Sequence, residues 1–128
     1  MSKRKHADFA GVTAALQDYF DGIHEGDVEK LRGVFAPTAN LYSSAGGDLE
    51  ELSLAQYLER VAGRPSPASQ GQTRTDRIVA IDFSGPDSAI AKVELSVPPR
   101  HFVDLLTFLR LDGRWRIVCK AYHVAAVD

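Results

Sequence analysis

The chain has 128 residues, of which 45% are hydrophobic and 25% are charged, and its formal net charge is −2. This length is typical of one domain, and the composition is that of an ordinary globular protein. The small net charge gives no electrostatic reason to expect nucleic-acid binding, and the single cysteine, Cys119, excludes an internal disulfide.

The sequence carries no signal for a membrane or for export. No stretch approaches the roughly 18 apolar residues of a membrane-spanning helix. The basic residues 1–6 are not followed by the apolar core of a signal peptide. We therefore expect a cytoplasmic protein with one domain over residues 1–128, disordered at residues 1–6, and no membrane partner.

Two helices are predicted at the start of the chain. Apolar residues recur at three- and four-residue steps over residues 7–26, the spacing of an amphipathic helix. Asp8 suits the N-cap of this helix, and Gly26 suits the left-handed position at its end. Asp27 begins a second, shorter helix with almost no connection, so the two must meet at a sharp angle. Pro37 is expected to end the second helix.

Short strands and a third helix follow. Residues 39–44 and 48–52 are each expected to form a short strand. The third helix begins at Ser53, because Ser53 and Gln56 have the spacing of a capping box, which satisfies backbone donors at a helix start. Residues 63–71 are rich in proline, glycine and serine and predict a loop.

The remaining sequence is typical of antiparallel sheet. Strands are expected over residues 72–83 and 88–97, and Pro98-Pro99 breaks the chain before a long hairpin over residues 100–124. The hairpin turns at Asp112-Gly113, a dipeptide that suits the positive φ angles of a type I′ turn. This order predicts an α+β fold, with a four-stranded meander and the helices on one of its faces.

The turn also predicts which hairpin residues share a face. Arg110 lies opposite Trp115, and an uninterrupted register then forms an apolar row that includes Asp104 and His123 at its far end. These two residues would be diagonal neighbours, within reach of each other. A bulge in the hairpin would move one of them to the other face.

The opposite face of the hairpin carries an apolar strip between basic residues. A strip of this length is too large to face water, so we expect a homodimer through the outer face of the sheet. Its members are Val103, Leu105, Thr107, Leu109, Leu111, Val118 and Tyr122.

Three stretches carry a family resemblance: YFDGIHEGD at 19–27, residues 31–41, and FVD at 102–104 with DGRWRIVCK at 112–120. In these stretches the chain resembles the nuclear transport factor 2-like superfamily. It looks most like the small bacterial putative lumazine-binding proteins, neighbours of the polyketide-cyclase-like and ketosteroid-isomerase-like branches. The resemblance implies a cone-shaped curved antiparallel sheet, of four long strands plus one or two short ones, wrapped around three N-terminal helices. It also implies an internal pocket and a dimer through the sheet.

Asp104 and His123 are the candidate catalytic residues. A carboxylate in an apolar cone suits proton transfer, and a histidine beside it could relay the proton or orient the acid. The alternative for Asp104 is a structural acid neutralised by a neighbour. The alternative for His123 is a satisfied core histidine.

Six other residues are expected to contact a ligand. A tyrosine hydroxyl there suits donation to a ligand carbonyl or an anionic intermediate, although each tyrosine also fits a core aromatic. The six are Tyr19, His24, Tyr42, Tyr57, Phe102 and Trp115.

These residues favour two functions nearly equally. The first is binding of a small apolar molecule in an internal pocket without catalysis. The alternative is a general acid–base enzyme, an isomerase, cyclase or dehydratase, acting on a small apolar carbonyl compound. A third hypothesis is an assembly module that acts through its dimer surface. We expect neither a metal nor another cofactor, because the four histidines lack metal-ligand spacing and no phosphate loop is present.

Overall fold

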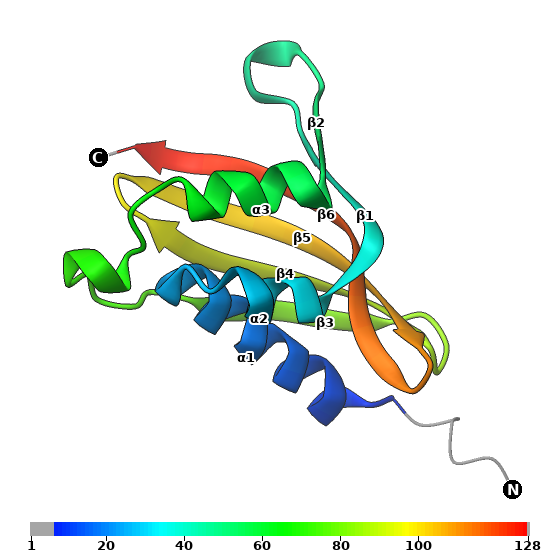
Figure 1. The fold of residues 1–128 in the computed structure, drawn as a ribbon. Helices are drawn as coiled ribbons and strands as arrows, with labels where there is room; N and C mark the ends of the chain where they lie inside the picture. Colours follow the sequence, from blue (N-terminus) through cyan, green and yellow to red (C-terminus); the bar gives the residue numbers. More distant parts are fainter. Residues whose placement is uncertain (1–6, 128) are drawn as a thin grey trace, which may run out of the picture.

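The computed structural model describes residues 7–127, so the expected disorder of residues 1–6 lies outside the described part of the chain (Figure 1). Three helices pack on one face of a curved, open sheet, which confirms the α+β fold class. The helices are α1 Phe9–Glu25, α2 Val28–Val34 and α3 Leu54–Ala62, with short 3-10 turns η2 Ala45–Gly47 and η3 Ala68–Gln70. The strands are β1 Phe35–Ser43, β2 Glu50–Ser53, β3 Arg77–Phe83, β4 Ser88–Val97, β5 Arg100–Leu111 and β6 Arg114–Val127.

The predicted helix caps are confirmed. The carboxylates of Asp8 and Asp27 each accept a backbone N–H in the first turn of α1 and α2. Gly26 ends α1 with a φ angle of 69°. Ser53 and Gln56 form the reciprocal capping box of α3. These local hydrogen bonds satisfy helix-end donors, so each helix begins where its cap residue stands.

The six strands form one sheet in the order β2-β1-β6-β5-β4-β3. Neighbouring strands are antiparallel except for β1 and β6, which run parallel. Pro37 lies inside β1 and does not end α2, since α2 stops at Val34 and the strand begins at once. The β1–β6 pairing is irregular between Phe35 and Asn40, so the missing N–H of Pro37 costs no regular ladder bond there.

The strand expected over residues 72–83 is shorter than predicted and begins at Arg77. Its polar start has a different role, because the guanidinium of Arg74 binds Asp21 of α1 at 2.7 Å and Asp76 at 2.9 Å. These ion pairs hold the segment before β3 against the end of the first helix.

The core lies between α1 and the inner face of the β5–β6 hairpin. Each large apolar side chain removed from water contributes about 1.5–3 kcal/mol to folding. The fully buried members include Val12, Leu16 and Tyr19 of α1 and Leu106, Phe108 and Ile117 of the hairpin. Within residues 7–127 no helix is both long and apolar enough to cross a membrane.

The hairpin turn and the pairs nearest to it are as predicted, but the register changes beyond Phe108. Asp112 and Gly113 have φ angles of 52° and 78°, as a type I′ turn requires. Phe108 lies opposite Ile117, and the register then shifts, leaving Val118 as an extra residue in β6. A bulge of one residue moves the side chains that follow it to the other face, here from Cys119 to Val124, where the register shifts again.

The bulge overturns the expected pairing of Asp104 with His123. His123 lies opposite Val103 on the outer face and is exposed, whereas Asp104 points inward and is buried. Lys120 and Tyr122 take the inward positions of β6 instead. The outer face therefore carries His123, and the inner face carries a lysine and a tyrosine.

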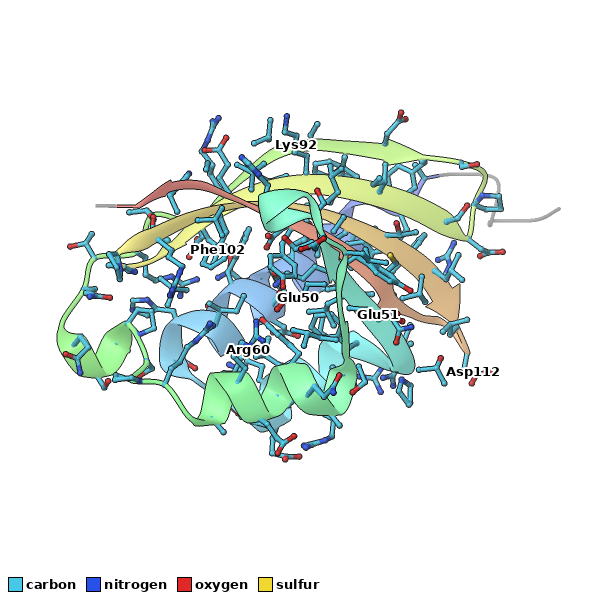
Figure 2. The ribbon with its side chains drawn as sticks, turned by 90° about the horizontal axis from the view of Figure 1, so that it is seen from above. Glu50, Glu51, Arg60, Lys92, Phe102 and Asp112 are labelled. Carbon is cyan, nitrogen blue, oxygen red and sulfur yellow. The ribbon has the colours of Figure 1, made fainter. Side chains whose placement is uncertain are left out.

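The outer face of the sheet is not covered by any helix in residues 7–127 (Figures 1 and 2). Figure 2 shows Lys92 of β4 on this outer side, with Arg60 and Phe102 on the inner side. Six large apolar side chains of β3, β4 and β5 are each more than a third exposed. They are Ile78, Val79, Ile90, Leu105, Leu109 and Leu111.

Candidate functional site

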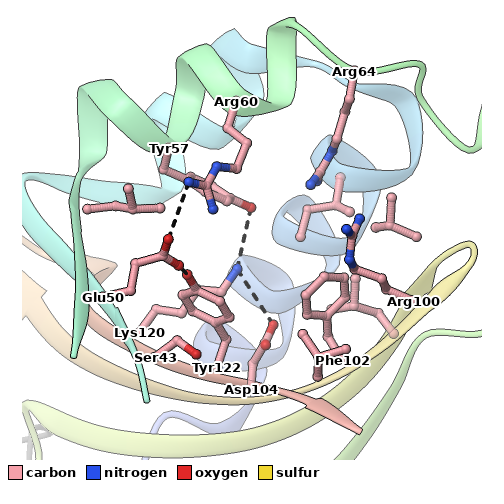
Figure 3. Close-up of a pocket in the computed structure, with 15 residues that line it drawn as sticks. Ser43, Glu50, Tyr57, Arg60, Arg64, Arg100, Phe102, Asp104, Lys120 and Tyr122 are labelled. Carbon is pink, nitrogen blue, oxygen red and sulfur yellow. Dashed lines mark hydrogen bonds and ion pairs between the residues drawn. The ribbon is translucent and has the colours of Figure 1, made fainter. Parts of the chain in front are cut away.

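A cavity of about 430 Å³ lies between α3 and the inner face of the sheet (Figure 3). It is at the end of the β5–β6 hairpin away from the Asp112-Gly113 turn. A volume of this size accommodates a small organic molecule. Its apolar lining consists of Ile23, Leu52, Leu95, Val97, Phe102 and Val124.

Asp104 lies at the floor of the cavity and is 1% exposed. The hydroxyl of Tyr19 donates a hydrogen bond to its Oδ2 at 2.5 Å. Burial raises the pKa of Tyr19 well above its ordinary value, and the charge of Asp104 raises it further, so this phenol keeps its proton. The other oxygen, Oδ1, is buried and has no hydrogen-bond partner among the residues that the structure describes.

Lys120 enters the same site from β6 and is 6% exposed. Its Nζ lies 3.8 Å from Asp104 Oδ2 and 3.5 Å from the hydroxyl oxygen of Tyr57. Three tyrosine rings surround the ammonium group, with centroids at 4.6 Å for Tyr57, 5.2 Å for Tyr19 and 5.6 Å for Tyr122. Buried charges occur in proteins when they are paired, and here a carboxylate and three ring faces offset the burial of one cation.

On one side of the cavity mouth, Glu50 interacts with both Tyr122 and Arg60. It accepts a hydrogen bond from the Tyr122 hydroxyl and pairs with Arg60 at 3.6 Å (Figure 3). The hydrogen bond from Tyr122 lowers the pKa of Glu50, and the charge of Arg60 lowers it further. Burial and the bond to Glu50 raise the pKa of Tyr122 to about 12, so Tyr122 stays neutral and Glu50 ionised near pH 7.

Arg64 and Arg100 lie on the other side of the mouth (Figure 3). Neither guanidinium group has a hydrogen-bond or ion-pair partner within residues 7–127. Counting Arg60 and Lys120, the cavity is lined by four cationic side chains and by two carboxylates, Glu50 and Asp104. The mouth therefore favours an anionic group.

The structure brings some of the sequence-predicted residues together and leaves others apart. Asp104, Tyr57 and Phe102 line the cavity, and Tyr19 lies directly behind Asp104. The remaining candidates lie elsewhere in the molecule.

Tyr42 lies on the β1–β2 pair, where its hydroxyl is 3.3 Å from the Asn40 side chain. His24 borders a small separate recess of about 10 Å³ near Arg74. Trp115 is close to the hairpin turn, donates its indole N–H to Asp8 and packs on Phe83. None of these three, nor His123, is among the residues that line the cavity.

Sequence reasoning missed Lys120, Tyr122 and the arginines of the mouth. For Arg60 a signal was present, because Tyr57 and Arg60 are three residues apart in α3, a step that places side chains on one helix face. For Lys120 the signal is absent, because its position depends on the bulge at Val118.

Comparison with known proteins agrees with this architecture. The model of the putative lumazine-binding family matches residues 7–123. The chain is 24% identical over 119 residues to the protein named Aldolase FrzH of Cladobotryum sp, with 91% of each chain covered.

Two solved structures are also similar. One is an NTF2-like protein of unknown function from Methylobacillus flagellatus KT, with a TM-score of 0.80 and 29% identity over 93% of both chains. The other, from Silicibacter pomeroyi DSS-3, has a TM-score of 0.78 and 27% identity over 97% of this chain and 99% of that one. Since the family match spans nearly the whole chain, the protein belongs to the putative lumazine-binding family, within the nuclear transport factor 2-like superfamily.

Proposed function

We propose that the protein binds a small molecule with an apolar body and an acidic group in the cavity between α3 and the sheet. One observation carries this proposal: an apolar-walled cavity has two arginines at its mouth, Arg64 and Arg100, whose guanidinium groups have no hydrogen-bond or ion-pair partner within residues 7–127. Apolar walls supply affinity, whereas a few placed polar groups orient the ligand. Arginine in particular binds carboxylates and related anions through paired hydrogen bonds.

A matched pair of fluorescent probes tests this proposal. The anionic probe is 8-anilinonaphthalene-1-sulfonate, and the neutral one is N-phenyl-1-naphthylamine, which has the same rings without the sulfonate. We expect both to bind and the anionic probe to bind more tightly. The double variant Arg64→Gln/Arg100→Gln should weaken the anionic probe about tenfold or more, since a hydrogen bond to a charged group contributes about 1.5–3 kcal/mol.

Two further variants locate the probes. Val124→Trp fills the cavity from β6 and should abolish binding of both, whereas Lys92→Gln on the outer face of the sheet should change neither. Fluorescence that persists in Val124→Trp would place the probes elsewhere, for example on the exposed apolar strands, and would overturn the proposal.

A second candidate function is a general acid–base enzyme acting on a carbonyl compound. It is favoured by Asp104, a buried carboxylate whose Oδ1 has no partner among the described residues, and by the similarity to a protein named an aldolase. In this proposal Asp104 accepts a proton from the ligand while the Tyr19 hydroxyl holds its other oxygen. Lys120 takes the place beside the base that His123 was expected to occupy.

A further inference from the structure

We infer that Lys120 is an amine nucleophile that forms an imine with the carbonyl group of a ligand bound in the cavity. The inference rests on the proposed ligand-binding function and adds the chemical class of the ligand, an aldehyde or ketone that also carries an acid. It is drawn from the placement of one buried lysine and its neighbours.

The first observation is that Lys120 makes no close hydrogen bond to Asp104, the carboxylate that neutralises it. A lysine that only neutralised Asp104 would hydrogen-bond to it, but Nζ is 3.8 Å from Oδ2, beyond hydrogen-bond range. The Tyr19 hydroxyl already occupies that oxygen at 2.5 Å. The hydrogen bond that Nζ donates to Tyr57, at 3.5 Å, is at the long limit.

The second observation is that Lys120 faces the cavity from a fixed position. It is 6% exposed yet lines the cavity, and Tyr57 and Tyr122, whose rings flank the ammonium group, line it too. A buried lysine held in place beside a binding space is the arrangement that imine chemistry needs, because the amine meets the carbonyl in a defined orientation.

The third observation is a pair of proton carriers beside the amine, since Asp104 Oδ2 lies 3.8 Å and the Tyr57 hydroxyl 3.5 Å from Nζ. In the proposed reaction Asp104, the carboxylate nearest to Nζ, takes a proton from the Lys120 ammonium, and the neutral amine then adds to the carbonyl carbon. The carbonyl oxygen takes a proton from the attacking nitrogen, and the Tyr57 hydroxyl lies beside Nζ to assist this transfer. Loss of the hydroxyl with the last nitrogen proton releases one water and leaves the imine. Asp104 then returns its proton to the imine nitrogen, which restores the carboxylate and the positive charge beside it.

The mouth of the cavity specifies the rest of the ligand. With the carbonyl at Lys120, an acidic group at the other end of the molecule points toward Arg64 and Arg100. The compound 4-formylbenzoate has this order of groups, an aldehyde and a carboxylate at opposite ends of an apolar ring. The isosteric 4-methylbenzaldehyde lacks the carboxylate and serves as the control.

Reductive trapping tests the inference. The wild-type protein is incubated with 4-formylbenzoate and sodium cyanoborohydride, which reduces an imine to a stable amine, and each lysine is assayed by peptide mass spectrometry. We expect labelling of Lys120 to be roughly tenfold faster or more than labelling of Lys92, which is exposed on the outer face of β4. The control aldehyde should label Lys120 more slowly, and the difference should vanish in Arg64→Gln/Arg100→Gln.

Binding is measured separately, by competition of 4-formylbenzoate with 8-anilinonaphthalene-1-sulfonate in the absence of the reductant. Competition without preferential labelling of Lys120 overturns the inference and leaves the proposed binding function intact. If 4-formylbenzoate neither competes with the probe nor labels Lys120 preferentially, both the inference and the proposed binding function are overturned. Lys120→Arg keeps a positive charge beside Asp104 but cannot form the imine, so its labelling should fall to that of the remaining lysines, with Lys92→Arg as the matched control. The wild-type comparison of Lys120 with Lys92 decides the matter even where Lys120→Arg does not fold.

Discussion

Asp104 and Lys120 are charged side chains buried together, and each depends on the other. The pair lies in the wall between the cavity and the core, where Tyr19 is completely buried. Removing one member of a buried pair leaves the other without an opposite charge, which costs about 3–5 kcal/mol. Replacing both by uncharged groups avoids that penalty. The pair therefore adds little net stability compared with two uncharged side chains of similar size.

This leads to a prediction for the stability of three variants. Lys120→Met should destabilise the protein by about 3 kcal/mol, because Asp104 remains buried without a cation. The double variant Asp104→Asn/Lys120→Met should be more stable than Lys120→Met alone. Urea unfolding measures these differences, with Lys92→Met on the outer face as a control that should be close to neutral. A loss in Lys120→Met no larger than in the control would show that the pair is not coupled.

At the scale of secondary structure, Asp8 joins the start of α1 to the turn end of the β5–β6 hairpin. Its carboxylate accepts hydrogen bonds from the Gly11 N–H at 2.9 Å and from the indole N–H of Trp115 at 2.8 Å. It also pairs with Arg110 at 3.3 Å. The Trp115 hydrogen bond is the largest cause of the lowered pKa of Asp8, followed by Gly11, with the charge of Arg110 adding to them.

The lowered pKa of Asp8 predicts a stability that depends on pH. An aspartate in the unfolded chain has a pKa of about 3.9, so the folded chain releases this proton at a pH where the unfolded chain still binds it. The contribution of Asp8 is therefore fully present above about pH 5 and is lost as the pH falls through the folded-state pKa. Asp8→Ala should cost roughly 1 kcal/mol or more at pH 7, and the difference from the parent should shrink toward pH 3.

Trp115→Phe tests whether the hydrogen bond from Trp115 causes the lowered pKa of Asp8 and the pH dependence that follows from it. It keeps an aromatic ring against Phe83 but removes the main donor to Asp8. In that background the effect of Asp8→Ala should depend less on pH, as measured by urea unfolding between pH 3 and pH 7. An effect of Asp8→Ala that is the same at all pH values in the parent would contradict the assignment.

The same elements show which parts of the structure were accessible from sequence. Caps at Asp8, Asp27 and Ser53 and the turn at Asp112-Gly113 rest on contacts within a few residues, so local sequence patterns predict them. Asp104 was also predictable as an inward residue, because β5 keeps a regular alternation from the turn as far as this position.

The partner of Asp104 was not accessible in the same way. Ile117, Val118 and Cys119 are all apolar, so the hydrophobic pattern of β6 is satisfied whether or not a residue bulges out. What distinguishes the two registers is the surroundings of Lys120. The bulged register places it beside Asp104 and among tyrosines from α1 and α3, and the contacts with Tyr19 and Tyr57 link residues more than sixty positions apart. Long-range contacts of this kind leave no trace in a local pattern.

At the scale of the whole molecule, the sheet separates two surfaces with different properties. The inner face holds the cavity and its charged groups, whereas strands β3, β4 and β5 expose large apolar side chains. Leu105 and Leu109 lie four residues apart on β5, so their side chains share a face, and they are 44% and 37% exposed. An exposed apolar surface on several adjacent strands is typical of an interaction site.

We therefore predict a homodimer through the outer face of the sheet. Leu105→Glu or Leu109→Glu should give a folded monomer or an insoluble protein, because each would bury a carboxylate without a partner in the interface. Size-exclusion chromatography with light scattering measures the mass, and Ala14→Glu, at an exposed position of α1, is the control that should leave the mass unchanged. A parent protein that is monomeric at micromolar concentration would contradict the dimer.

Because the cavity opens on the inner face, a folded monomeric variant should still bind the anionic probe, and Val124→Trp should still abolish that binding. Loss of probe binding in a folded monomer would instead favour a protein that acts through its dimer surface.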